Sequence, residues 1–323
     1  MVYKAGCKVN LETGAVLAVS APLKFHGFKT KFTSRPRGHT IGLLAVLFCG
    51  SVSAPSQVQS QGLLAAPDLV TDRPGFTEPT NLVTPGRLQI ENGFSYDWGH
   101  DGSRLFAAGS RLIRLGISKR FELRLASDGY LASFVPGEQR AARDRGMADA
   151  SIGAKLGLFE ETRFLPAISF LPSLSLPSGH AVFSSRGYDP QLNLSWSKDL
   201  PGEFNLGGNA IVAAITDGVS RRMERAFSLS AAHILPRGFG GYAEIFSIRP
   251  ASAAARPVNV VNGGVTHLLG PNLQVDVAIG RSISGQGPRY FVAGGLVVRS
   301  PRSYFARQAK KSFENMKMLA KPQ

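Results

Sequence analysis

Apolar side chains recur at every second position in this chain, in segments of about ten residues separated by Gly, Pro, Asp or Ser. The segment 86–98 shows the pattern most clearly. Leu88, Ile90, Phe94, Tyr96 and Trp98 fall on one face, and Gln89, Glu91, Gly93, Ser95 and Asp97 fall on the other. Successive side chains of a strand point to opposite faces, so this alternation predicts a strand with one apolar and one polar face. Tyr96 and Trp98 end the apolar face, which is where a membrane-interface girdle places aromatic residues.

The alternation continues to about residue 299. The segments 121–128, 148–158, 191–197 and 273–280 alternate in the same way, and less regular strands are predicted near 104–117, 164–177, 204–215, 225–235, 238–249, 257–269 and 289–299. Twelve strands in about 215 residues allow roughly 18 residues for each strand and its turn, which suits a closed antiparallel sheet. We therefore predict an all-β fold, an antiparallel transmembrane β-barrel of about 12 strands spanning 86–300.

A water-soluble β-sandwich also alternates, but its outward face is rich in Lys and Glu. Charged residues make up only 18% of this chain, and the polar face of its strands is mostly Gly, Ser, Ala, Asn and Gln. A crowded barrel interior accounts for that composition better. A soluble exported β-sheet protein that binds a ligand stays open as an alternative.

The net charge of +15 lies mainly at the two ends of the chain: residues 1–40 carry +6 and residues 301–323 carry +5, which leaves +4 for 41–300. This is too little for the basic face of a nucleic-acid-binding domain, so we expect no nucleic-acid partner. The only cysteines, Cys7 and Cys49, precede the expected mature start, which excludes disulfides and thiol ligands from the mature chain.

An export signal is predicted over 1–54. A long basic stretch ends at Arg37, an apolar run follows over 41–48, and small residues stand two apart at Val52 and Ala54. The apolar run is too short for a spanning helix, which needs roughly 20 residues. The domains are therefore a signal sequence (1–54), an N-terminal periplasmic or plug segment (55–85), the barrel (86–300) and a basic C-terminal tail (301–323).

Seven stretches together resemble the outer-membrane transporter family grouped with the MetA pathway of phenol degradation. They are Thr71–Glu78, Val83–Glu91, Leu112–Arg124, Asp149–Lys155, Leu171–Gly179, Trp196–Gly202 and Leu273–Gly280. The resemblance implies an outer-membrane barrel of a Gram-negative bacterium that passes small solutes, including aromatic or hydrophobic ones, with outer-membrane lipid as its other partner. It implies no catalytic residue and no cofactor, and it leaves the oligomeric state unspecified.

Six charged residues fall on the polar faces and are the predicted pore-lining residues: Glu91, Glu122, Arg124, Asp149, Lys155 and Asp276. Selective ion filters use rings of one sign, so this mixture argues against strong ion selectivity. An alternative is that these charges form a neutral network that braces the barrel wall.

The segment before the first strand carries Asp72, Arg73 and Glu78, with Pro74 fixing its backbone. Two interpretations stay open for it: a plug that enters the barrel and pairs with lumen charges, or a solvated periplasmic lead-in.

No Walker loop, His-Glu-x-x-His motif, Gly-x-Ser-x-Gly elbow or paired-cysteine metal site occurs in the chain. Ser228 and Ser230 lie near His233 and His267 in candidate strands, but most such histidines are packed or surface residues, and we predict no enzyme. The function hypotheses are a passive channel or transporter for small solutes, a structural barrel without transport, and the soluble ligand-binding protein.

Overall fold

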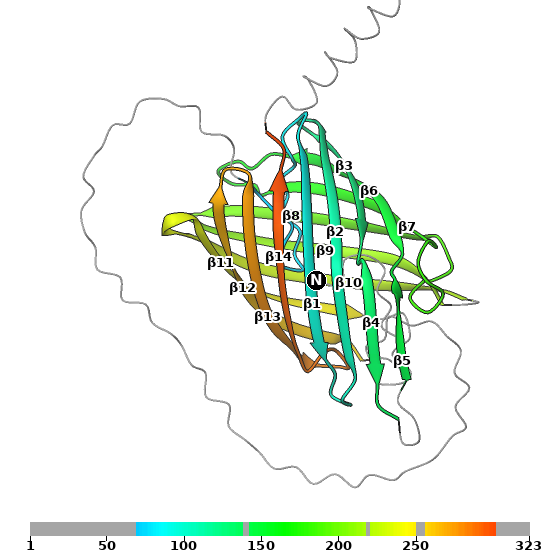
Figure 1. Ribbon diagram of the computed structural model, residues 1–323. Coiled ribbons are helices and arrows are strands. Elements are labelled where there is room, and N and C mark those ends of the chain that lie inside the picture. The colour runs from blue at the N-terminus through cyan, green and yellow to red at the C-terminus, as the bar shows by residue number, and fades with distance from the viewer. Residues whose placement is uncertain (1–68, 138–141, 218–219, 250–255, 302–323) are drawn as a thin grey trace, which may run out of the picture. The chain divides into compact units, whose positions relative to one another are not determined.

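The computed structural model describes residues 69–137, 142–217, 220–249 and 256–301, which form fourteen strands in one antiparallel sheet (Figure 1). The strands are β1 (Leu88–Trp98), β2 (Arg104–Ser118), β3 (Phe121–Ser127), β4 (Tyr130–Val135), β5 (Ala142–Met147), β6 (Ala150–Phe159), β7 (Ala167–Leu176), β8 (Asp189–Leu200), β9 (Phe204–Asp217), β10 (Ser220–Leu235), β11 (Phe239–Arg249), β12 (Val258–Gly270), β13 (Leu273–Ser284) and β14 (Tyr290–Arg299). A single 3-10 turn, Pro236–Gly238, joins β10 to β11. In these residues no helix has the length and apolar character needed to cross a membrane. The predicted signal sequence and most of the predicted tail lie outside the described residues.

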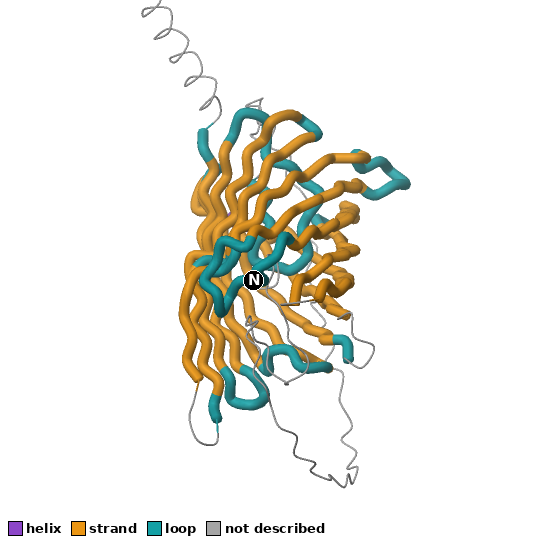
Figure 2. Tube along the Cα trace, turned by 90° about the vertical axis from the view of Figure 1, so that its right-hand side faces the viewer, coloured by secondary structure: helices purple, strands orange, loops and turns teal. Residues whose placement is uncertain are grey.

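The sheet closes on itself because β1 pairs with both β2 and β14 (Figures 1 and 2). β3 and β4 follow each other in the chain and both pair with β2, so they form one wall strand interrupted at Asp128 and Gly129. β6 pairs with β3 and β5 with β4, so these two form another strand, interrupted at Ala148 and Asp149. The wall is therefore a closed antiparallel barrel of twelve strands, which confirms the predicted fold.

The two faces of the wall have opposite chemistry. On β1, Phe94 is 50% exposed on the outside, whereas Gln89 is 1% exposed on the inside. The same arrangement holds around the barrel, where exposed apolar side chains include Leu123, Leu125, Ile152, Leu192, Leu194, Phe227, Leu229, Ile245, Val277, Ile279, Leu296 and Val298. Buried polar residues and exposed apolar ones reverse the distribution of a water-soluble protein. This outer surface matches the hydrocarbon layer of a membrane.

The two ends of the barrel differ in the length of their connections. At the end where β1 finishes, the connections have 5, 6, 12, 2, 8 and 5 residues; at the other end they have 2, 7, 3, 3 and 2 residues. We call these the distal end and the proximal end. The first residue of β1 and the last residue of β14 both lie at the proximal end, because an even number of antiparallel strands returns the chain to its starting side.

Candidate functional site

The segment 69–86, which precedes β1, lies across the inside of the barrel. Its backbone N–H groups donate hydrogen bonds to inward-facing side chains: Asp72 to Glu91 of β1 (3.1 Å), Val83 to Glu122 of β3 (2.7 Å), Glu78 to Asn209 of β9 (2.7 Å) and Thr77 to Glu244 of β11 (2.8 Å). In the strand order of the closed sheet, β1 and β9 stand on opposite sides of the ring. The segment therefore spans the lumen. Irregular backbone at membrane depth needs partners from the protein, and the wall side chains supply them.

Arg114 of β2 is the centre of an ion network that ties this segment to the wall. Its guanidinium is fully buried and lies 2.7 Å from the carboxylate of Glu122, 3.1 Å from that of Glu91 and 3.1 Å from that of Asp72. It also donates to the carbonyl of Asn81 at 3.0 Å. A buried cation is costly unless it is paired and hydrogen-bonded, so wall and segment complete one polar unit.

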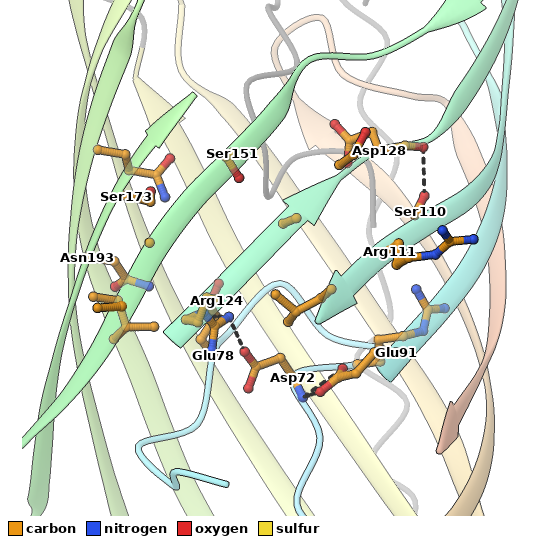
Figure 3. Close-up of a pocket in the computed structure, with 18 of the residues that line it drawn as sticks. Asp72, Glu78, Glu91, Ser110, Arg111, Arg124, Asp128, Ser151, Ser173 and Asn193 are labelled. Carbon is orange, nitrogen blue, oxygen red and sulfur yellow. Dashed lines mark hydrogen bonds and ion pairs between the residues drawn. The ribbon is translucent and has the colours of Figure 1, made fainter. Parts of the chain in front are cut away.

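Two further cations extend the network, and Figure 3 shows one of them, Arg124, beside Asp72 and Glu78. Arg124 of β3 lies 2.5 Å from a carboxylate oxygen of Asp72 and 3.0 Å from one of Glu78. Lys155 of β6 lies 3.2 Å from Asp72 and donates to the carbonyl of Pro79 at 2.9 Å. The unit thus joins four carboxylates to three cations. Its charges largely cancel, so the unit holds the segment to the wall and does not resemble an ion filter, which has charges of one sign. We call this unit the clamp.

Arg73 binds the neighbouring part of the wall, where β13 and β14 follow β1 in the strand order. Its guanidinium makes two hydrogen bonds to Asp276 of β13, at 3.0 and 3.3 Å, and donates to the carbonyl of Gly294 at 2.7 Å. It lies over two glycines that face each other on β1 and β14, Gly93 and Gly295. A Cβ atom on either glycine would come within 2.2 Å of the Arg73 side chain. The two glycines therefore leave the space that this guanidinium fills.

Phe76 gives the segment an apolar anchor. Its ring stacks on Phe246 of β11 with 4.2 Å between centroids and 13° between planes. It belongs to a buried cluster of inward-facing side chains from β10 to β14: Ala226, Phe246, Ile248, Val258, Val260 and Phe291. This cluster fills the distal part of the lumen on the β10–β14 side, so open space near the distal end lies along the other strands.

The segment separates two cavities. The distal cavity, about 90 Å³, is bordered by Ser110, Asp128, Ser151, Ser173, Gln191 and Asn193 together with Leu112, Ala126, Ala154 and Leu171 (Figure 3). The proximal cavity, about 570 Å³, is bordered by Glu203, His233, Tyr242 and Thr266. Residues 72–75 line both cavities. The backbone around Arg73 and Pro74 is thus the partition between them.

Comparison with known proteins places this architecture in a family. The model of the family described as "Putative MetA-pathway of phenol degradation" matches residues 71–300. The chain belongs to this family. The match begins at Thr71, so this phenol-degradation family model covers the lumen segment as well as the barrel.

Solved structures share the fold at low sequence identity. An outer membrane channel from Pseudomonas putida F1 has a TM-score of 0.53 and 14% identity, covering 70% of this chain and 99% of the channel. The KdgM porin in complex with disordered oligogalacturonate has a TM-score of 0.44 and 11% identity, covering 65% and 98%. The NanC porin has a TM-score of 0.43 and 8% identity, covering 66% and 100%. A search of curated protein sequences finds no match.

The structure places all six predicted pore-lining residues on the inner face of this family member's barrel, each at most 8% exposed. It brings four of them, Glu91, Glu122, Arg124 and Lys155, together around the segment, and places Asp276 apart from these, on Arg73.

Asp149 is separate from the others. It accepts N–H hydrogen bonds from Gly179 and Ser185 at 2.8 and 2.9 Å and so holds the distal connection between β7 and β8. All three segment residues named from the sequence, Asp72, Arg73 and Glu78, bind wall charges.

Sequence reasoning missed Arg114, Asn209 and Glu244, which also bind the segment. Arg114 is preceded by a bulge in β2, where Gly93 pairs with Ser110 and Phe94 with Ala108. The bulge moves even-numbered residues to the inside, and the alternation read along 104–117 does not reveal that change. Asn209 and Glu244 stood in strands whose alternation was less regular.

Ser228 and His233 both lie on β10 and His267 on β12. Ser228 accepts a hydrogen bond from Thr77 at 2.9 Å, and His233 stacks on Phe204 at 4.2 Å. No serine–histidine hydrogen bond joins these residues in the described chain. Nor do the described residues contain a group of three or more His, Cys, Asp or Glu suited to a metal ion.

Proposed function

We propose that this chain is an outer-membrane channel for small uncharged solutes, in which the segment 69–86 closes the path between the distal and proximal cavities. The observation that carries the proposal is that residues 72–75 form part of the wall of both cavities. A solute that crosses the lumen must therefore pass the segment. The clamp and the Arg73 contact hold it to adjoining strands, and its contacts with Asn209 and Glu244 hold it to β9 and β11 on the other side of the ring.

The outer surface of the barrel and the lengths of the connections at its two ends support a location in the outer membrane. The exposed apolar belt fits a bilayer, and the short connections of the proximal end are typical of the periplasmic side of outer-membrane barrels. The distal end would then face outward, with the lumen segment entering from the periplasm. The predicted export signal supports the same placement.

The distal cavity indicates the class of solute. Its lining combines hydroxyl and amide side chains with leucine and alanine side chains. It also includes charged residues, most of which are paired within the network or with the wall: Asp72, Arg73, Glu78, Glu91, Arg111, Arg124 and Asp128. Two buried acceptors on its wall, Asn193 Oδ1 and Asp128 Oδ2, have no hydrogen-bond partner within the described residues. Unsatisfied buried acceptors favour a ligand that brings a donor. An apolar ring with one hydroxyl group, as in a phenol, meets both requirements and agrees with the family description.

Deleting residues 67–80 tests the partition. Single-channel conductance in planar bilayers should rise, because the two cavities would merge. Lys198→Gln, which removes a partly exposed charge at the proximal rim that bonds Glu161 and Thr162 outside the segment, serves as the control and should leave the conductance unchanged. A deletion variant that folds, shown by heat-modifiable gel mobility, and still conducts like the parent chain would contradict the proposal.

A structural barrel without transport is the second candidate, supported by how completely the network fills the centre. Swelling of proteoliposomes with neutral, anionic and cationic solutes of matched size separates the two functions. The channel predicts faster swelling for neutral solutes. Absence of permeation for the whole panel, in both the parent and the deletion variant, would favour the structural barrel.

A further inference from the structure

Arginine and aromatic side chains form one row around part of the distal rim, on the outside of the barrel. Cross-strand pairing aligns Tyr290 of β14 with Trp98 of β1, Trp98 with Arg104 of β2, Arg104 with Phe134 of β4, and Phe134 with Arg143 of β5. Arg281 of β13 lies beside Tyr290, with 5.3 Å from its guanidinium carbon to the ring centroid. We call these six residues the distal arginine–aromatic row.

The arginines of the row are held by rings. Arg104 and Arg143 lie 6.0 and 5.6 Å from the centroid of Phe134, one on each neighbouring strand. All three arginines of the row are exposed, and no ion pair among the described residues involves them. Such contacts orient a guanidinium while leaving its N–H donors free for another acceptor.

A hollow on the outer face lies at the β5 end of this row. It measures about 810 Å³ and is bordered by Arg104, Arg143 and Arg145, by the rings of Tyr96, Phe106, Tyr130 and Phe134, and by Ala132, Ser133 and Asp144. Its border thus contains three arginines and one acidic residue. The hollow combines positive charge with aromatic surface, as a site for a charged headgroup on an acyl chain requires.

The carboxylates of the distal half do not neutralise the row, because most point inward. Asp97, Asp128, Asp149 and Asp189 are each at most 7% exposed. At the proximal rim, by contrast, exposed charges of both signs occur, as in the Lys198–Glu161 pair at 2.8 Å. The outward arginines of the distal rim therefore present their charge to the surrounding leaflet.

We propose that the distal arginine–aromatic row and its hollow bind the phosphate groups of a phosphorylated lipid headgroup in the leaflet around the distal end, which in an outer membrane is lipid A. Arginine binds phosphate through paired N–H donors, and the aromatic rings lie where headgroup and acyl chain meet. The inference rests on the membrane orientation in the proposed function but not on conduction.

Native mass spectrometry of the folded full chain in detergent tests this inference, with bisphosphorylated lipid A and enzymatically dephosphorylated lipid A as probes. The row variant combines Arg104→Gln, Arg143→Gln and Arg281→Gln. The matched control removes the same charge from exposed residues of the proximal connections, by Arg120→Gln, Arg163→Gln and Arg237→Gln. Heat-modifiable gel mobility verifies that each variant is folded.

The parent chain and the control should retain bisphosphorylated lipid A, and the row variant should bind it about tenfold or more weakly. Dephosphorylated lipid A should bind all three proteins as weakly as the row variant binds the phosphorylated form. Equal retention by the row variant and the control, or equal retention of both lipids by the parent, would overturn the inference. Conductance measured on the same samples keeps the two proposals separable, because a chain that never conducts can still retain the lipid.

Discussion

The guanidinium of Arg73 occupies the place that a side chain on Gly93 would take. A Cβ atom built on Gly93 would lie 2.0 Å from Arg73 Nη1, and its three nearest atoms all belong to Arg73. The wall and the lumen segment thus fit so closely here that one added methyl group on Gly93 would collide with Arg73. The first of the following predictions uses this complementarity.

Gly93→Ala should displace the Arg73 side chain without disturbing the barrel wall, because the added methyl meets only the end of a flexible side chain. We expect the docking of the segment to weaken by roughly 1–3 kcal/mol and the open probability in planar bilayers to rise. Gly270→Ala is the control, since a Cβ there meets nothing within 4 Å. Equal open probability in the two variants would show that the Arg73 contact does not hold the segment.

Arg114→Met should lower the free energy of unfolding by about 3–5 kcal/mol, because it leaves three buried carboxylates without their shared cation. Urea titration followed by gel mobility measures the effect. Lys198→Met removes a partly exposed ion pair to Glu161 and should change the free energy by about 1 kcal/mol or less. If the free energy of unfolding falls by the same small amount in both variants, the network around Arg114 is not a stabilising unit.

Phe76→Ala should free the segment from the β10–β14 side of the lumen, because it removes the ring stacked on Phe246. A reporter cysteine, Thr77→Cys, in a chain whose Cys7 and Cys49 are replaced by serine, would then react faster with a water-soluble maleimide. Phe94→Ala removes an outward-facing ring that is 50% exposed and should leave the rate unchanged. A reaction rate that Phe76→Ala does not alter would contradict the anchoring role.

Asn193→Leu should reduce the discrimination between phenol and toluene in the distal cavity. The parent offers the free Oδ1 acceptor to a hydroxyl group, so phenol should block the current at lower concentrations than toluene. Losing that hydrogen bond should lower the ratio of the blocking concentration of toluene to that of phenol by up to about tenfold. Asn259→Leu, at the distal end of β12, is the control, and a parent that does not distinguish the two solutes would exclude the hydroxyl acceptor.

The strand pattern could be predicted from the sequence because a barrel wall imposes one period on every strand. From Leu88 to Trp98 the side chains alternate with one exception, Asn92 on the apolar face, and the structure has them on β1 with the expected faces. Irregularities were not visible in the pattern. Asp128-Gly129 is a sequence typical of a turn, yet Gly129, with φ of 74°, only interrupts the strand, which continues in the same register as β4.

The partners within the lumen were beyond sequence reasoning for a different reason. The charge and the strand face of Asp72, Arg73 and the inward-facing residues identified them as candidates from the sequence. Which of these side chains contact one another depends on the register between strands that are distant in the sequence. Asp276 is 203 residues from Arg73, and the pairing of β13 with β14 decides that it faces the same glycine pair. Local patterns contain no information about such contacts.

A reversible covalent lock tests the central claim, that movement of the segment opens the path. The hydroxyl oxygens of Thr77 and Ser228 lie 2.9 Å apart, so Thr77→Cys with Ser228→Cys in the Cys7→Ser, Cys49→Ser chain should form a disulfide between the segment and β10. Each single cysteine variant serves as a control. We predict that single-channel conductance is low when the pair is oxidised and returns to the parent level after reduction, while the controls do not respond to reductant. Equal conductance in the oxidised and reduced states of a chain shown by mass to carry the disulfide would contradict the account.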